Sequence, residues 1–260
     1  MRISAGALLA AAAAGAVQAQ EAPICTDRPA KANAVCTVPA GRVQIESTGI
    51  GWSLTDAAGA RTELLTVGAA VAKIGLSERS DLQIGFTPYA ALTVRNGARS
   101  RVSGIGDLVV RYKHRLTNAD APVQLALIPF VKLPTAASGL GNGRVEGGLA
   151  MPVSFTLAGA VTMTLGPEAD VLADADGQGR HLALVNLVNV STPIAPRLTL
   201  AGELWTNFNF DPAGTVEQAS ADAALAYAVS DDLQLDIGAN IGLTRATPDF
   251  EAYAGVSVRF

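Results

Sequence analysis

Charged residues are scarce in this sequence. Asp, Glu, Lys and Arg make up only 16% of its 260 residues, against roughly 25% in an ordinary soluble domain. The formal net charge is −4, so no basic field indicates nucleic acid as a partner. The composition is therefore unlike that of a typical charged, water-exposed protein surface.

Long apolar runs are also absent once the first nineteen residues are set aside. The stretch "LALIPFV", at residues 125–131, is among the longest, and it contains a proline. A membrane-spanning helix needs roughly 18 or more apolar residues in succession. A helical membrane protein is therefore excluded, whereas a membrane β-barrel is not, because its strands show only alternation.

Histidine and cysteine are each present twice. His114 and His181 lie far apart in the sequence, so we expect no metal site and no cofactor. Cys25 and Cys36 lie close together near the mature N-terminus, and in an oxidising compartment we expect them to form a disulfide. Lipid modification of Cys25 is the alternative, although "EAPIC" lacks the small residue that usually precedes a lipidated cysteine.

The first nineteen residues have the pattern of a secretory signal peptide. Arg2 supplies the positive end, residues 7–16 form an apolar stretch too short to cross a bilayer, and residues 17–19 place small side chains at a cleavage site. An alanine-rich helix is the alternative. We expect the mature protein to begin at Gln20, outside the cytoplasm.

The rest of the chain alternates between apolar and polar residues, which is the period of a β-strand with two different faces. Near the C-terminus one face reads Leu233, Leu235, Ile237, Ala239, Ile241, Leu243, and the other Gln234, Asp236, Gly238, Asn240, Gly242, Thr244. The pattern predicts strands at about 41–54, 61–76, 81–95, 104–116, 121–134, 143–157, 160–173, 180–191, 197–210, 217–229, 232–245 and 249–260.

The connections between these strands alternate in length. Short ones at 77–80, 117–120, 158–159, 192–196 and 230–231 alternate with mostly longer, glycine-rich ones at 55–60, 96–103, 135–142, 174–179 and 211–216. Short periplasmic turns and longer external loops are typical of outer-membrane barrels. We therefore predict a signal peptide at 1–19, a periplasmic N-terminal segment with the disulfide at 20–40, and a barrel at 41–260. The segment is either a plug or a stapled lead-in.

A soluble β-sandwich or lipocalin-like barrel would show the same alternation with its apolar face inward. However, the polar face here is rich in glycine, alanine and threonine and poor in lysine, unlike a soluble surface. A long series of strands without edge protection also favours closure. The fold class we predict is all-β: a closed, antiparallel, up-and-down transmembrane β-barrel of about twelve strands.

Several stretches resemble one family of outer-membrane proteins, labelled "MetA-pathway of phenol degradation". They are "GIGDLVVRYKHRL" (104–116), "PFVKLPTAASGLGNGRVEGGLAMPVSF" (129–155), "LQLDIGANIGLTRATPDFEAYAGVSVRF" (233–260) and "CTDRPAKANAVCTVPAGRVQIE" (25–46). The resemblance implies a barrel in the bacterial outer membrane that passes small, often hydrophobic or aromatic compounds. It transfers no catalytic residues. The terminal Phe260 resembles the signal read by the barrel-insertion machinery.

Strand parity assigns many charged residues to the lumen. The candidates are Asp107, Arg111, Lys113, Lys132, Glu146, Glu168, Glu203, Asp222, Asp236, Glu251 and Arg259. Either they form salt bridges that fill a narrow barrel, or they create a transverse field that orients polar solutes. A barrel of about twelve strands is expected to have a small or partly plugged pore.

Three functional classes remain for such a barrel. We expect a channel for small-molecule solutes, embedded in outer-membrane lipid. The alternatives are a structural barrel without transport and a lipid hydrolase. A hydrolase needs a serine within reach of a histidine, and neither His114 nor His181 is followed by a suitably placed serine, so we expect no enzyme.

Overall fold

The computed structural model describes residues 22–260, and the signal peptide predicted at residues 1–19 lies outside this range. The described chain is built of β-strands and connections. No helix within residues 22–260 has the length and apolar character that a membrane crossing requires. The strands are β1 (Val43–Ala57), β2 (Ala60–Ser77), β3 (Ser80–Phe86), β4 (Tyr89–Asn96), β5 (Ala98–Gly104), β6 (Leu108–Arg115), β7 (Val123–Leu133), β8 (Glu146–Ala150), β9 (Val153–Ala158), β10 (Val161–Leu165), β11 (Glu168–Ala173), β12 (Arg180–Ala195), β13 (Leu198–Asn209), β14 (Val216–Ala228), β15 (Leu233–Gly242) and β16 (Phe250–Arg259).

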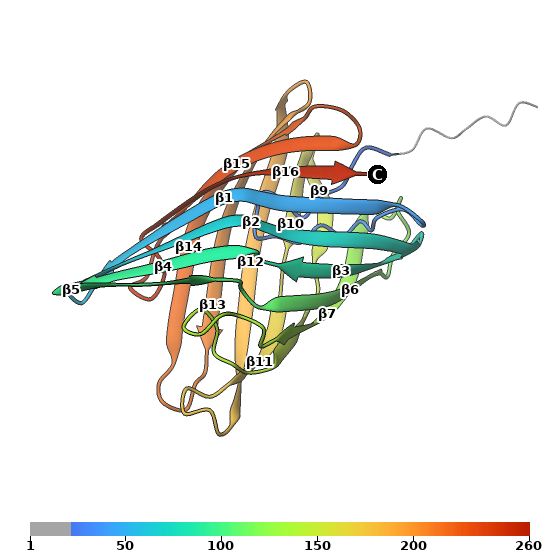
Figure 1. Cartoon of the computed structure of the whole chain (residues 1–260). Coiled ribbons are helices and arrows are strands. Elements are labelled where there is room, and N and C mark those ends of the chain that lie inside the picture. Colours follow the sequence, from blue (N-terminus) through green and yellow to red (C-terminus); the bar gives the residue numbers. More distant parts are fainter. Residues whose placement is uncertain (1–21) are drawn as a thin grey trace, which may run out of the picture.

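These segments form a closed antiparallel barrel of twelve strands (Figure 1). Four barrel strands consist of two segments each, namely β3 with β4, β5 with β6, β8 with β9, and β10 with β11. The barrel closes because β1 pairs with β2 on one side and with the last strand, β16, on the other. The predicted fold class is therefore confirmed.

Prolines lie at three of the four interruptions. Pro88 separates β3 from β4, Pro152 separates β8 from β9, and Pro167 separates β10 from β11. Proline has no N–H to donate to a neighbouring strand, so the ladder breaks there. The sheet is nevertheless held across one of these breaks, since the N–H of Met151 donates to the carbonyl of Pro167 at 2.9 Å.

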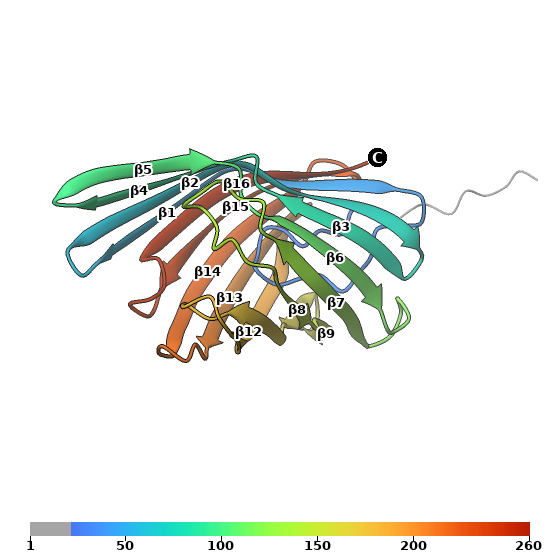
Figure 2. The same cartoon turned by 60° about the horizontal axis from the view of Figure 1, so that its bottom comes forward.

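The prediction of a loop at residues 96–103 is wrong. The chain turns tightly at Gly97, where φ is 68°, and returns as β5, which pairs along its length with β4. Asn-Gly is the preferred pair for such a tight hairpin turn, and the polar sequence that follows it is an exposed strand rather than a loop. Figure 2 shows this hairpin extending outward beside the β1–β2 hairpin, with which it pairs through β2 and β4.

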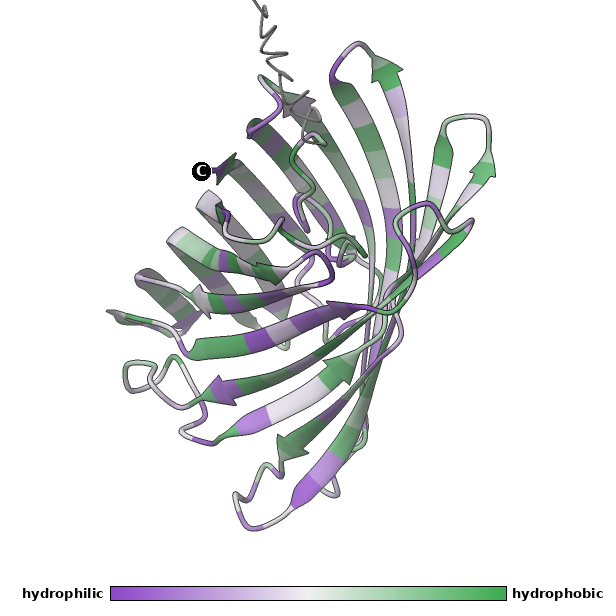
Figure 3. Ribbon diagram, turned by 90° about the vertical axis from the view of Figure 1, so that its right-hand side faces the viewer, coloured by the Kyte–Doolittle hydropathy of each residue, from purple (hydrophilic) through white to green (hydrophobic). Residues whose placement is uncertain are grey.

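The two faces of the barrel wall are reversed relative to a soluble protein. Side chains buried against the interior include Asp236 and Asn240, each 4% exposed. Their neighbours Ile237 and Ile241 are each 57% exposed, and in Figure 3 hydrophobic and hydrophilic residues alternate along the strands. A wall with an apolar outer face and a polar inner face is suited to lipid outside and water inside. The strand faces predicted for this region are therefore confirmed.

The N-terminal segment, residues 22–42, runs inside the barrel (Figure 2). It enters at the rim with the short turns, where the N–H of Ile24 donates to the carbonyl of Asp231 at 2.6 Å. It returns to the same rim where the N–H of Gly41 donates to the carbonyl of Gly75 at 3.0 Å. The predicted Cys25–Cys36 disulfide is present and joins the ascending and descending parts of the segment.

Candidate functional site

The candidate site is the lumen, and one side of its wall is acidic. Glu203 on β13 lies directly opposite Asp222 on β14, and Asp222 lies opposite Asn240 on β15. Asn240 in turn donates from Nδ2 to Glu251 on β16 at 2.8 Å. Because side chains alternate along each strand, these groups converge on the interior. We call Glu203, Asp222, Asp236 and Glu251 the acidic wall.

Two cations of the N-terminal segment meet the acidic wall. Arg28 makes a two-pronged contact with Asp236, with Nη2 at 2.5 Å from Oδ1 and Nε at 3.1 Å from Oδ2. Lys31 Nζ lies 2.6 Å from Asp222 Oδ2 and 3.9 Å from Glu251 Oε2. Buried carboxylates are costly without partners of opposite charge. Arg28 and Lys31 supply such partners for the carboxylates of the acidic wall.

The backbone of the segment also binds this wall. The N–H groups of Lys31 and Ala32 donate to the two oxygens of Glu203, at 3.1 and 2.9 Å. The Lys31 ammonium also lies 5.2 Å from the centre of the Trp205 ring, within the range of a cation–π interaction. These contacts therefore fix the position of the segment's tip, in addition to the ion pairs that balance its charge.

The opposite side of the lumen is basic. Lys73 on β2 and Lys113 on β6 each place Nζ 2.6 Å from a carboxylate oxygen of Asp27. Lys113 also donates to the carbonyl of Ala34 at 2.8 Å, and Lys73 is paired with Glu46 on β1. We call Lys73 and Lys113 the basic wall. The segment thus presents its anion to the basic wall and its cations to the acidic one.

The charge state of Asp27 follows from these contacts. Burial by itself would raise the pKa of Asp27, but the ammonium groups of Lys113 and Lys73 outweigh burial and hold the pKa well below its ordinary value. Asp27 is therefore ionised whenever the segment is in place. An ionised Asp27 is the form that the two lysines bind.

The remaining lumen candidates occupy three places. Arg111 donates to the side chain of Asn33 in the segment. Lys132 joins Asp107 and Glu146 at 3.2 and 3.0 Å, nearer the long loops. Arg259 pairs with Asp232 at 2.7 Å, at the rim with the short turns. Glu168 shares the first of these places, since it lines a cavity together with Lys31, Asn33 and Arg111. Whether any of them contacts a passing solute stays a proposal.

Three inward-facing residues of this network were not among the sequence candidates. Lys73 lies on the inward face of β2, and its parity could have identified it. Glu46 lies on β1, where the register shifts between Thr48 and Ile50, so a simple alternation rule fails there. Asp81, 1% exposed, accepts a hydrogen bond from the N–H of Val38 at 2.9 Å, and it was overlooked because it stands beside a turn.

Cavities remain on both sides of the segment. One of about 200 Å³ lies towards the rim with the short turns and is lined by Thr199 and Gln234. Another of about 400 Å³ lies towards the long loops and is lined by Val71, Val109 and Arg111. The segment therefore lies between two cavities of the lumen.

The family comparison agrees with this architecture. Residues 26–260 match the family described as "Putative MetA-pathway of phenol degradation". The chain belongs to this family. No curated protein matches the chain in sequence.

Solved structures with the same fold include an outer membrane channel, an autotransporter domain and a porin. The COG4313 outer membrane channel from Pseudomonas putida F1 is similar with a TM-score of 0.67 and 17% identity, over 87% of this chain and 98% of that one. The translocator domain of the autotransporter NalP from Neisseria meningitidis gives 0.54 and 12%, over 86% and 90%. The NanC porin gives 0.50 and 11%, over 83% and 98%. Together with the apolar outer face, these likenesses show the fold of a transmembrane β-barrel.

Proposed function

We propose that this barrel passes small molecules, including hydrophobic or aromatic ones, across the outer membrane. The observation that carries the proposal is a lumen divided by a segment that leaves a cavity on each side. Two comparisons support the same function. The family label refers to phenol degradation, and one similar barrel is named as an outer membrane channel. A wide aqueous pore is not supported, because the segment lies across the interior.

The larger cavity has the size and lining of a small-ligand site. Its volume of about 400 Å³ falls within the roughly 300–1,000 Å³ that such sites occupy. Val71, Gly85 and Val109 lie next to one another on three neighbouring strands and form an apolar floor. Lys31 and Arg111 border the same cavity and add polar groups. This combination suits a compact apolar body with one polar substituent.

A cavity-filling substitution tests the proposal. A Cβ added at Gly85 would meet the side chains of Val71 and Val109 at ordinary distances of 3.7 Å, so Gly85→Leu places its side chain in the cavity. Gly202→Leu is the matched control, because a Cβ there meets nothing within 4 Å and the residue is exposed on the lipid side. We expect Gly85→Leu to reduce uptake of a radiolabelled aromatic compound by cells several-fold, and Gly202→Leu to leave it unchanged.

Planar-bilayer conductance with the purified protein separates the routes. Discrete, small ionic steps support an aqueous path past the segment. Uptake that depends on the protein, without such steps, supports a lateral hydrophobic path. If uptake is the same with and without the protein and no steps appear, the transport proposal fails and a structural barrel is the better account.

We further propose that Phe260 serves membrane insertion. Its side chain is 63% exposed, facing outward from the last strand, and its N–H donates to the carbonyl of Val43 on the first strand at 2.8 Å. The terminal aromatic therefore lies at the seam where the barrel closes. Phe260→Ala is expected to lower the amount of folded barrel in the outer membrane, measured by heat-modifiable migration in gels, while refolding into detergent is retained.

A further inference from the structure

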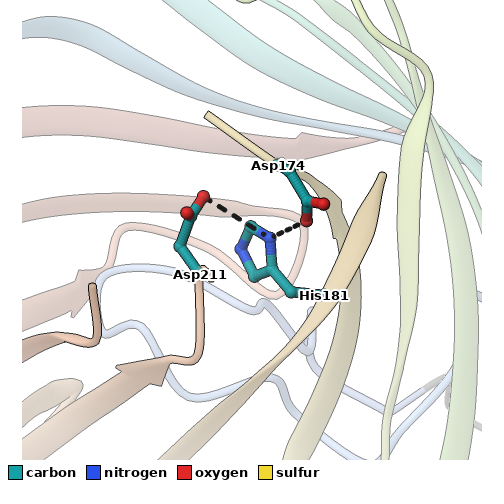
Figure 4. A group of neighbouring side chains, drawn as sticks. All are labelled: Asp174, His181 and Asp211. Carbon is teal, nitrogen blue, oxygen red and sulfur yellow. Dashed lines mark hydrogen bonds and ion pairs between the residues drawn. The ribbon is translucent and has the colours of Figure 1, made fainter. Parts of the chain in front are cut away.

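At the rim with the long loops, a histidine and two aspartates from three neighbouring strands converge (Figure 4). Asp174 directly follows β11, His181 is the second residue of β12, and Asp211 follows β13. One ligand atom from each of the three lies within 4.8 Å of the other two. Asp174 and Asp211 lie beyond the ends of β11 and β13, and the proposed transport path does not use the cluster.

Hydrogen bonds within the protein satisfy this cluster only in part. His181 Nδ1 lies 2.8 Å from Asp174 Oδ1 but 3.6 Å from Asp211 Oδ2, so a single N–H satisfies only one carboxylate. The His181 side chain is only 5% exposed, and its Nε2 has no hydrogen-bond partner among the described residues. Two carboxylates therefore face one buried imidazole, with an excess of negative charge.

We propose that Asp174, His181 and Asp211 form a binding site for one divalent transition-metal ion, such as Zn²⁺. One imidazole nitrogen and two carboxylate oxygens are a ligand set that Zn²⁺ accepts, whereas Ca²⁺ and Mg²⁺ prefer oxygen ligands alone. At bond lengths of ~2.1 Å, tetrahedral ligands lie about 3.4 Å apart. The two nitrogen–oxygen distances, 2.8 and 3.6 Å, lie on either side of this value.

The surrounding backbone shapes the site. The N–H of Ala175 donates to Asp211 Oδ2 at 2.8 Å, and the N–H of Ala213 donates to Oδ1 at 2.7 Å, which fixes the carboxylate. A Cβ on Gly179 would lie 2.0 Å from Asp174 Oδ2, so only glycine leaves room for this carboxylate beside the turn. These contacts serve as the supporting shell that orients metal ligands.

A bound ion would join two loops at this rim. Asp174 belongs to the turn between β11 and β12, and Asp211 to the loop between β13 and β14. Within residues 22–260, the hydrogen bond from the N–H of Ala175 to Asp211 and the approach of His181 to Asp211 already link the two loops. The sequence predicts no metal site because the two histidines lie far apart, but the fold brings two carboxylates to His181 in place of a second histidine.

The test is zinc binding to the purified, untagged mature chain in detergent, measured by isothermal titration with zinc chloride. We expect one Zn²⁺ per chain, with affinity reduced at least tenfold in His181→Gln and in Asp211→Asn. His114→Gln is the matched control, since it removes the other histidine of the chain, and it should bind zinc as the wild type does.

A second measurement protects the test against misfolded variants. Co²⁺ bound to the wild-type chain at this site should give the strong ligand-field absorption of a four-coordinate ion, and Zn²⁺ should abolish it. If the wild type binds no zinc, or if His181→Gln binds it as tightly as the wild type, the proposal is overturned. The cluster would then be a hydrogen-bonded link between the two loops.

Discussion

The two sides of the lumen differ in the sign of their charge, and the N-terminal segment matches both. The acidic wall binds Arg28 and Lys31, whereas the basic wall binds Asp27. A segment rotated within the barrel would bring like charges together. The comparison shows that the lumen charges do not face an empty pore; most of them position a piece of the same chain.

This arrangement favours one of the two interpretations of the lumen charges. A transverse field across an open pore requires acidic and basic groups that face each other through water. Here Asp236 has no exposed side-chain surface, and Lys113 only 1%, and each is paired with the segment. The observed pairing is the case of salt bridges that fill a narrow barrel, with the N-terminal segment as the filling.

The largest effect is expected from reversing a charge of the segment. Lys31→Glu places a carboxylate where Nζ now lies 2.6 Å from Asp222, so repulsion should displace the tip of the segment from the acidic wall. We expect single-channel conductance to rise several-fold. Arg99→Glu makes the same change of charge on the exposed strand β5 and should leave the conductance unchanged. A similar rise in both variants would show that the net charge alone is responsible.

The next effect concerns the basic wall. Asp27→Asn leaves the buried ammonium of Lys113 without a carboxylate at 2.6 Å, and breaking a buried pair costs roughly 3–5 kcal/mol. We expect the free energy of unfolding, measured in denaturant, to fall by about 3 kcal/mol. Asp120→Asn, on an exposed turn, should change it by less than about 0.5 kcal/mol. Equal losses in the two variants would mean that the pairs of Asp27 with Lys73 and Lys113 add no more stability than an exposed carboxylate does.

The charge of Asp27 gives a pH prediction. Because the folded protein lowers its pKa, the stabilisation from Asp27 is complete above the ordinary value of 3.8 and declines only as the pH falls further, towards the pKa in the folded state. The ¹³C shift of the Asp27 carboxyl group, assigned by its loss in Asp27→Asn, should remain that of a carboxylate at pH 4. Half-protonation at pH 4 would contradict the pairing with Lys73 and Lys113.

The smallest effect is expected at the outer rim. Glu63 pairs with Arg61 at 3.1 Å and with Arg95 at 2.9 Å, but the two arginine side chains are 44% and 45% exposed. Exposed ion pairs contribute little because water and salt screen them. Glu63→Gln should leave the denaturation midpoint unchanged. If Glu63→Gln lowered the free energy of unfolding as much as Asp27→Asn does, ion pairs at the rim and in the lumen would not differ in their contribution to stability.

Much of the barrel could be predicted from the sequence, because one face of each strand meets lipid and the other face does not. That difference imposes strict alternation, as at Ile237 and Asp236, and the short and long connections give the order of strands. The β4–β5 hairpin was missed because a polar strand that protrudes from the barrel has no apolar face to reveal it. The strand breaks at proline follow from the missing N–H and could have been predicted.

The contents of the lumen could be predicted only in part. Parity placed Glu203, Asp222 and Asp236 inside, but it says nothing about their partners. Arg28 and Asp236 lie 208 positions apart in the sequence, so only the closed barrel brings them together. The same reason hid the cluster of Asp174, His181 and Asp211, whose members become neighbours only through strand pairing.

The central claim is that residues 22–38 occupy the lumen and restrict passage through it. The most direct test compares planar-bilayer conductance of the mature chain with that of a variant lacking these residues, both shown to be folded by circular dichroism. We predict small conductance for the complete chain and a large, stable increase for the deletion variant. Equal conductance in the two proteins would contradict the claim.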